Sequence, residues 1–386
     1  MESRSPRRDQ RGFTLVELLV SVAVLGLIMG ATLAALSDAY RANESAREVS
    51  GLSNNLRVGA DLIVRDFIQV GQGLPTGRLV QVAAGGSFTP INRPAPPSSP
   101  CAIWPAGTTE IRAVTVGPGC GPVINGAATD IVTTIAGDTT FDHVPLATGA
   151  SGINVAQRKI TIALPGPDPA GTLPLIDPRG VDISNGGPDD IRPGDLIMLT
   201  KGDHSALLEV TSVDGAQTIT FASGDPMNLN QFGASGVTGT LDVLAAAAPV
   251  GGTATEATRI RMMTYYLDNT ITPGEPRLMR RLNWGDPLAP PNQRARTVAF
   301  DIENLQFTYD LIDGVVNPAN VRMEAADLGG TGACAPNPCM LAQIRKINVF
   351  LGGRSGRRFT PTGDFFRNSL TTQVSLRSLA LVDRYR

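Results

Sequence analysis

The first part of the chain is dominated by apolar residues. From Phe13 to Leu36 the only charged residue is Glu17, and a run of this length spans a bilayer as a helix, since about 20 apolar residues suffice. Apolar residues then recur at steps of three and four: Val49, Leu52, Leu56, Ala60, Ile63, Phe67 and Val70. This period is typical of an amphipathic helix. The pattern predicts one long helix over residues 13–70, ended by Gly71, Gly73 and Pro75.

Strand patterns recur along the rest of the chain. They cover residues 130–135, 158–164, 195–200, 206–211, 217–221, 261–267, 277–282, 298–309, 344–351 and 371–377. Lys201-Gly202-Asp203 and Pro273-Gly274 are turn signals that predict hairpins, and Asp214-Gly215 predicts pairing of 217–221 with 206–211. No helix-length pattern separates these segments, so they predict mainly antiparallel sheet.

These patterns predict an α+β fold, in which a long N-terminal helix packs on a large antiparallel β-rich head. The predicted organisation is a leader at 1–12, an apolar helix at 13–36 and its amphipathic continuation at 37–72. A loop- and strand-rich region at 73–255 and a C-terminal antiparallel region at 256–386 follow. Gly (42) and Pro (29) are plentiful among the 386 residues, which favours loop-rich β structure because aliphatic residues remain common.

The charge distribution predicts which side of the membrane each part of the chain lies on, and it argues against nucleic acid as a partner. The first twelve residues carry four Arg and two acids, so the rest of the chain has a net charge of −4. A basic leader before an apolar helix stays in the cytoplasm, which places the head outside it. The head shows no broad basic face, so no nucleic-acid partner is evident.

Four cysteines lie in the part expected outside the cytoplasm: Cys101, Cys120, Cys334 and Cys339. An even number there suggests disulfides, and three pairings are possible. The local pairs Cys101–Cys120 and Cys334–Cys339 are favoured because each closes a short loop. A metal site is disfavoured, because no nearby His or second Cys pair completes four ligands.

The remaining candidate chemistry is sparse. His143 and His204 each follow an Asp, but an isolated Asp-His pair is more typical of a solvated loop than of a catalytic triad. A loop with Asp182, Asn185, Asp189 and Asp190 offers oxygen ligands for Ca²⁺ without EF-hand spacing, so a surface turn is favoured. Tyr265, Tyr266 and Tyr309 are expected to pack in the sheet. We therefore expect no enzyme, no catalytic or metal-binding residue and no cofactor.

The junction Arg11-Gly12-Phe13-Thr14-Leu15-Val16-Glu17 carries the most specific signal, because a carboxylate inside an apolar span is costly and points to a function. "GFTLVELLV" resembles the class III signal of type IV pilins and type II secretion pseudopilins. The resemblance implies cleavage by prepilin peptidase after Gly12, methylation of the new amine on Phe13, and pairing of Glu17 with the N-terminal amine of a neighbouring subunit. The alternatives are a secretory signal peptide and a plain membrane anchor, and neither explains Gly12 and Glu17.

The order of the head segments extends this resemblance. "GDLIMLTKGDHSALLEVTSV", "VAFDIENLQFTYDL" and "IRKINVFLGGRS" are similar to successive blocks of PilW-like minor pilins. J-type pseudopilins share part of the pattern. The resemblance implies a structural role in starting pilus assembly near the tip, with major and minor pilins, the inner membrane and the assembly platform as partners. The protein would leave the inner membrane for the pilus on the cell surface. A type II secretion or DNA-uptake pseudopilin, and a membrane-anchored enzyme or binding protein, remain alternatives.

Overall fold

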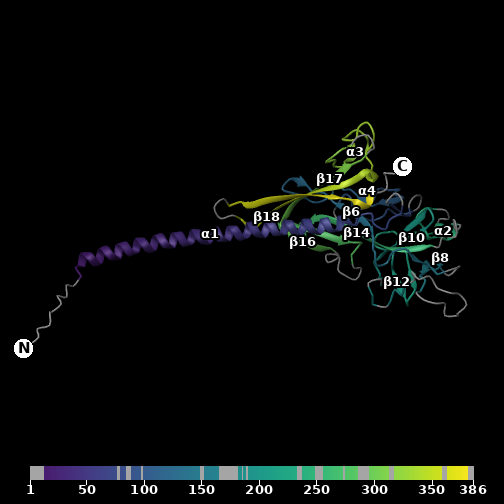
Figure 1. Cartoon of the computed structure of the whole chain (residues 1–386), viewed down its shortest axis with the longest axis horizontal. Coiled ribbons are helices and arrows are strands. Elements are labelled where there is room, and N and C mark those ends of the chain that lie inside the picture. Colours follow the sequence, from purple (N-terminus) through teal and green to yellow (C-terminus); the bar gives the residue numbers. More distant parts are fainter. Residues whose placement is uncertain are drawn as a thin grey trace, which may run out of the picture. The chain divides into compact units, whose positions relative to one another are not determined.

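The computed structural model describes residues 13–75, 79–83, 88–96, 99–147, 152–164, 181–184, 186–187, 190–232, 237–247, 255–272, 274–285, 295–312, 317–358 and 363–380. It confirms an α+β fold with a long N-terminal helix and antiparallel sheets (Figure 1). The contacts divide the chain into two units, residues 1–52 with 355–366 and residues 53–354 with 367–386. Each unit is described by itself.

The first unit contains most of helix α1, which begins at Leu15 and ends at Ile68. The side chains of residues 13–44 are exposed along its whole length. Beyond the apolar run the helix carries charges, and Glu44 forms an ion pair with Arg357 at 3.5 Å on the surface of this unit. An exposed pair of this kind contributes little stability.

The second unit begins with the amphipathic part of α1, and its apolar stripe is buried as the sequence predicts. Leu56, Ala60, Ile63, Phe67 and Val70 are all at most 3% exposed. The Phe67 ring packs edge-on against Tyr265, with their centroids 6.0 Å apart. Gly59 lets the helix approach the sheet closely, because a Cβ there would lie 3.0 Å from Leu278.

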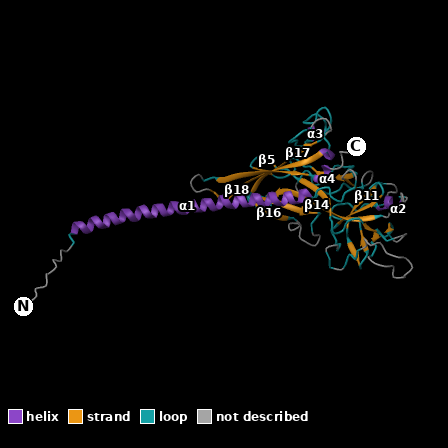
Figure 2. Ribbon diagram, viewed as in Figure 1, coloured by secondary structure: helices purple, strands orange, loops and turns teal. Residues whose placement is uncertain are grey.

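An eight-stranded antiparallel sheet forms the centre of the second unit (Figure 2). Its main path runs β11-β10-β14-β15-β16, and β6 and β7 also pair with the long strand β14, while β3 pairs with β6. The bounds are β3 Val114–Thr115, β6 Val132–Gly137, β7 Val144–Pro145, β10 Leu196–Lys201, β11 His204–Glu209, β14 Glu256–Asp268, β15 Arg277–Leu282 and β16 Arg296–Phe300.

Smaller sheets and short helices complete the fold. One sheet has the order β17-β18-β19, another β12-β13-β9-β8, and β1–β2 and β4–β5 are two-stranded. Their bounds are β1 Leu79–Gln81, β2 Glu110–Arg112, β4 Val123–Ile124, β5 Ala127–Ala128, β8 Ile153–Asn154, β9 Lys159–Thr161, β12 Ser212–Asp214, β13 Thr218–Thr220, β17 Ile302–Leu311, β18 Ile344–Arg358 and β19 Phe365–Ser375. The helices are α2 Leu241–Ala246, α3 Ala325–Leu328, the 3₁₀ helix η4 Leu341–Gln343 and α4 Arg377–Ala380.

The structure corrects one predicted strand and one predicted pairing. Residues 298–309 are not one strand, because Asp301 adopts a φ of 56° and separates β16 from β17, which join different sheets. The segment 217–221 forms a hairpin across Asp214-Gly215 as predicted, but β13 pairs with β12 and β9 and not with β11. The hairpin could be predicted because its turn signal is local. The partner of β13 could not, because it depends on where β11 ends.

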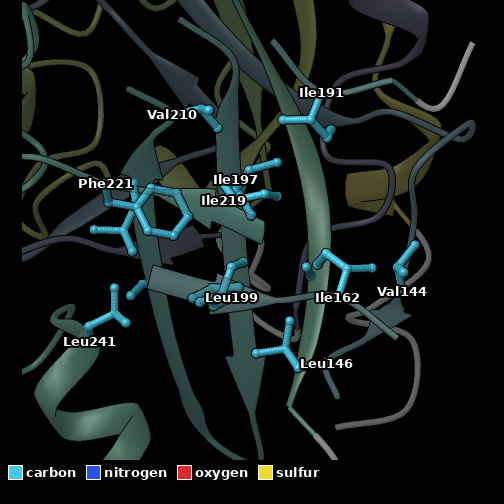
Figure 3. Packing of buried hydrophobic residues seen from close by; sticks show 14 of the residues in the cluster. Val144, Leu146, Ile162, Ile191, Ile197, Leu199, Val210, Ile219, Phe221 and Leu241 are labelled. Carbon is cyan, nitrogen blue, oxygen red and sulfur yellow. The ribbon is translucent and has the colours of Figure 1, made fainter. Parts of the chain in front are cut away.

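A buried apolar cluster lies between β10–β11, the β12-β13-β9-β8 sheet and α2 (Figure 3). Ile197 and Leu199 from β10 meet Ile219 from β13, Phe221 just after it and Leu241 from α2, and all five are fully buried. Burying such side chains stabilises the fold by roughly 1.5–3 kcal/mol each. Through this cluster, the β12-β13-β9-β8 sheet and α2 pack against the β10–β11 end of the central sheet.

All four cysteines form disulfides, joined in the two local pairs. Cys101 and Cys120 are 19 residues apart and link the proline-rich segment to the loop before β4. Cys334 and Cys339, five positions apart in the sequence, form the second disulfide, which lies after α3. Crosslinks over short loops restrict the unfolded chain and stabilise by about 2–4 kcal/mol on a loop-entropy estimate, with the shorter loop at the low end.

One buried polar cluster fastens the helix to the central sheet within the second unit. The Asp66 carboxylate accepts hydrogen bonds from the Tyr265 hydroxyl at 2.5 Å and from Arg280 Nε at 2.6 Å. Burial and the Asp66 charge raise the pKa of Tyr265, so its hydroxyl stays protonated. Burial acts to lower the pKa of Arg280, but the hydrogen bond and charge of Asp66 raise it on balance.

We expect Asp66→Ala to destabilise the protein by about 3 kcal/mol, because removing one partner leaves a buried charge uncompensated. The Asp66 side chain is 8% exposed and that of Arg280 21%. Urea unfolding of the detergent-solubilised chain measures the change. Asp61→Ala, at an exposed position on the same helix, is the matched control and should change stability little. Equal effects of both variants would contradict the role of the cluster.

Candidate assembly site at the start of the helix

The candidate site begins where helix α1 begins. Thr14 immediately precedes the helix, and Glu17 lies in its first turn. Oε2 of Glu17 accepts hydrogen bonds from the backbone N–H and the hydroxyl of Thr14, both at 3.0 Å, and Thr14 Oγ1 accepts from the N–H of Glu17 at 3.3 Å. This is a capping box, which satisfies N–H groups that a helix end leaves unpaired.

Thr14 is a structural residue that the functional interpretation of the sequence missed. The spacing Thr-x-x-Glu before an apolar run is the signature of a capping box, and it is present at 14–17. The same carboxylate also lies at the positive end of the helix dipole, where a negative charge is favourable. The structure therefore gives Glu17 a local role in addition to the intersubunit role that the resemblance implies.

The capping box leaves part of the Glu17 carboxylate available. Its hydrogen bonds all involve Oε2, and Oε1 has no hydrogen-bond partner among the described residues. Phe13 is 87% exposed at the helix start. Gly12, the other residue of the predicted cleavage site, lies outside the described residues. The described geometry thus presents an oriented carboxylate with a free oxygen next to the predicted new N-terminus.

The apolar half of α1 is uncovered along its length. Side chains on every side of the helix are exposed, including Leu15, Val16, Leu18, Leu19, Val20, Val22, Val24, Leu25, Leu27, Ile28, Met29, Leu33 and Leu36. Among the described residues, α1 is the one helix long and apolar enough to cross a membrane. A helix that is apolar all round needs lipid or other helices around it. This is consistent with membrane anchoring before assembly.

The few polar groups in this half are satisfied inside the helix. The Ser21 hydroxyl donates to the carbonyl of Leu18 at 2.9 Å, and the Thr32 hydroxyl donates to the carbonyl of Ile28 at 2.9 Å. No group from elsewhere in the described chain lies within 4 Å of a Cβ placed at Gly26 or Gly30. Glu17 is thus the one charged group on this apolar surface.

The other residues considered from the sequence do not form a comparable site. His143 Nδ1 lies 2.6 Å from Asp142 Oδ1 on the surface, and His204 is exposed at the start of β11. Tyr265 and Tyr309 are buried, as expected for packing residues. Asp182 accepts hydrogen bonds from Ser184 in a turn, whereas Asn185 and Asp189 lie outside the described residues. Within the described ranges, no three His, Cys, Asp or Glu side chains gather as metal ligands.

Comparison with known proteins gives one match, and it falls on this site. Residues 7–33 match the family model of the prokaryotic N-terminal methylation motif. No curated protein and no solved structure matches the chain. The matched segment contains the second half of the basic leader, the predicted cleavage point and the first turns of α1, including Glu17. The motif indicates a type IV pilin-like prepilin, either a pilin or a pseudopilin, that is processed by prepilin peptidase.

Proposed function

We propose that this protein is a minor pilin that takes part in starting the assembly of a type IV pilus. One observation carries the proposal: Glu17 is a lone carboxylate, held by Thr14 at the start of a helix whose surface is otherwise apolar and exposed. Such a surface suits a filament core, where helices of many subunits pack together. The charge then needs a partner on a neighbouring subunit.

The predicted partner is the N-terminal amine that cleavage creates on Phe13. An α-amine is mostly protonated at neutral pH, and methylation leaves it basic. In an apolar core each charge is costly alone, by about 3 kcal/mol on insertion scales. Pairing Oε1 of Glu17 in one subunit with the amine of Phe13 in the next removes both costs. The same pairing sets the axial position of each incoming subunit, since other positions leave the two charges apart.

A minor and terminal role follows from the size of the head. The second unit includes more than 300 residues attached to a single helix, and such a head is difficult to pack at every position around a thin core. At a filament end, neighbours are needed on one side only. PilW-like minor pilins, whose block order the head resembles, provide the precedent for this position.

We further propose that the head is structural and not catalytic. The most suggestive pair, Asp142–His143, is exposed on a loop, and the His143 side chain is 51% exposed. General acid-base groups are commonly held in a cleft, within reach of a bound substrate. Partly buried ionisable groups such as Asp66 and Arg280 instead connect elements of the fold.

The proposal predicts a protein that is scarce in filaments but needed for their number. Deleting the gene should sharply reduce pilus number on cells, while the few remaining filaments keep their normal composition. Quantitative proteomics of sheared pili should find this protein far below the major subunit, because only terminal positions accept it. Comparable abundance of the two would contradict the role as a minor subunit. Loss of protein secretion with normal pili would instead assign the chain to a type II secretion filament.

A further inference from the structure

A pocket lies on the second unit. It has a volume of about 470 Å³, in the range of small-molecule sites. Its walls come from the β4–β5 hairpin and from the β17-β18-β19 sheet, parts of which are labelled in Figure 2. Strands from distant parts of the sequence therefore meet around one hollow, which the proposed assembly role does not use.

The base of the pocket is organised by Glu303. This residue is the extra one in a β-bulge, because Ile302 pairs with Gly353 and Asn304 with Gly352. A bulge redirects a side chain, and the Glu303 carboxylate, 8% exposed, bonds Arg367 Nε at 2.8 Å and Arg354 Nη1 at 3.4 Å. Asn125 from the β4–β5 turn bonds it as well. The bulged carboxylate thus fixes residues from three of the surrounding segments.

The lining combines an aromatic ring with polar groups that have spare hydrogen-bonding capacity. Gly352 allows Asn304 and the Phe350 ring to lie close together, since a Cβ there would be 3.1 Å from Asn304 Cβ. Within the described part of the chain, the side-chain amide nitrogens of Asn304 and Asn368 and the hydroxyl of Ser369 have no hydrogen-bond partner. Asn304, Asn368 and Ser369 are all lining residues of the pocket, and polar groups with spare capacity are what orients a bound ligand.

The charges of the pocket restrict the class of ligand. Among the described residues that line the pocket, Glu303 and Arg367 are the charged ones, and they form an ion pair at 2.8 Å. Arg354, which also bonds Glu303, pairs with Asp301 at 3.8 Å, so two arginines face two carboxylates and no net charge is left to attract a phosphate, a carboxylate or a cation. A ligand that fits must be neutral, offer several donors and acceptors, and present an apolar face to Phe350. A sugar ring has these properties, because its hydroxyls both donate and accept while its C–H face packs on an aromatic ring.

We propose that this pocket binds a neutral saccharide. Asn304, Asn368 and Ser369 bond the hydroxyls, and the Phe350 ring packs against one face of the sugar. The volume accommodates one or two sugar units. This binding activity is a property of the head alone and does not rest on the filament role, so either can fail without the other.

The test is saturation-transfer NMR on the full chain, solubilised in a detergent without a sugar headgroup. The probes are methyl glycosides of glucose, galactose, N-acetylglucosamine and N-acetylgalactosamine, together with their disaccharides, at about 1 mM, a concentration suited to weak binding. N-acetylneuraminic acid and methyl phosphate, whose C–H protons the method can observe, are the charged comparisons. We expect transfer to at least one neutral probe and none to the charged ones.

Two variants connect that binding to the pocket. Asn368→Ala removes one hydrogen-bonding group and should weaken binding roughly tenfold. Phe350→Leu keeps apolar volume but removes the ring, and should weaken binding by a factor of about five. Thr371→Ala, exposed on the same strand and outside the lining, should bind like the parent protein. Equal melting temperatures show that the variants fold.

Three results would overturn the inference. They are no transfer to any neutral probe, neutral binding that survives both pocket variants, and a response confined to the charged probes. The last result would mean that Arg367 is available to anions in spite of its contact with Glu303.

Discussion

Glu17→Leu is expected to enter the membrane and lose its leader normally, yet to be absent from filaments. The substitution makes the apolar run of α1 continuous, which favours insertion. In the filament it leaves the N-terminal amine of a neighbouring subunit without its partner. An unpaired charge in an apolar core costs about 3 kcal/mol, which corresponds to a roughly hundredfold loss in incorporation. Immunoblots of sheared filaments and of membrane fractions measure the two quantities separately.

Two further variants separate the charge of Glu17 from its capping role. Glu17→Gln retains a side chain that completes a capping box with Thr14 but has no charge, so it should fail in assembly like Glu17→Leu. Asp38→Leu removes an acid from the same helix outside the apolar run and should assemble normally. Normal incorporation of Glu17→Gln would show that capping, and not charge pairing, is what assembly requires.

Gly12→Leu is expected to abolish processing, so that the full-length chain accumulates in the membrane. A peptidase that cuts between Gly12 and Phe13 must accept the residue before the cut in a confined pocket, and Gly12 has no side chain to accommodate. Without cleavage the amine of Phe13 stays in a peptide bond, and the charge pair with Glu17 cannot form. A shift in electrophoretic mobility or an intact mass of the membrane protein measures processing.

The control for this variant is Gly30→Leu, at a glycine with open space around it. It should be processed like the parent chain, although it changes the same residue type in the same segment. A mature N-terminus at Phe13 in Gly12→Leu would refute the assigned cleavage point.

The helix was predictable because its signals are local. The run from Phe13 to Leu36 and the stripe that ends with Phe67 and Val70 follow from period and length alone, and the structure confirms a helix from Leu15 to Ile68. Most strands were predictable as elements for the same reason. The burial of the stripe at 56–70 could also be expected, since an amphipathic helix needs a surface to cover.

The pairing of the strands was harder to predict from the sequence. The break at Asp301 depends on one residue with a positive φ between two apolar strands, which no strong turn signal marks in the sequence. The bulge at Glu303 and the pocket beside it depend on how β17, β18 and β19 pair with one another, and period alone does not determine this. The ion pair between Asp66 and Arg280 joins residues 214 positions apart. It could therefore not be predicted before the fold was known.

The candidate site at the helix start was predictable in its residues but not in its geometry. Glu17 and Gly12 stand out by type and position, whereas the hydrogen bonds of Thr14 show how the carboxylate is oriented. The structure adds that one carboxylate oxygen is occupied by the helix cap and that the other has no described partner.

The most direct test of the account is mass spectrometry of the N-terminal peptide of the protein purified from cell membranes. Cleavage after Gly12 and methylation predict a chain that begins at Phe13 and carries one methyl group on its α-amine. A chain that retains the basic leader would contradict it and leave a membrane-anchored protein of another class. A chain cut beyond the apolar run, with no helix residues before Ser37, would indicate an ordinary secretory signal peptide and would equally contradict it.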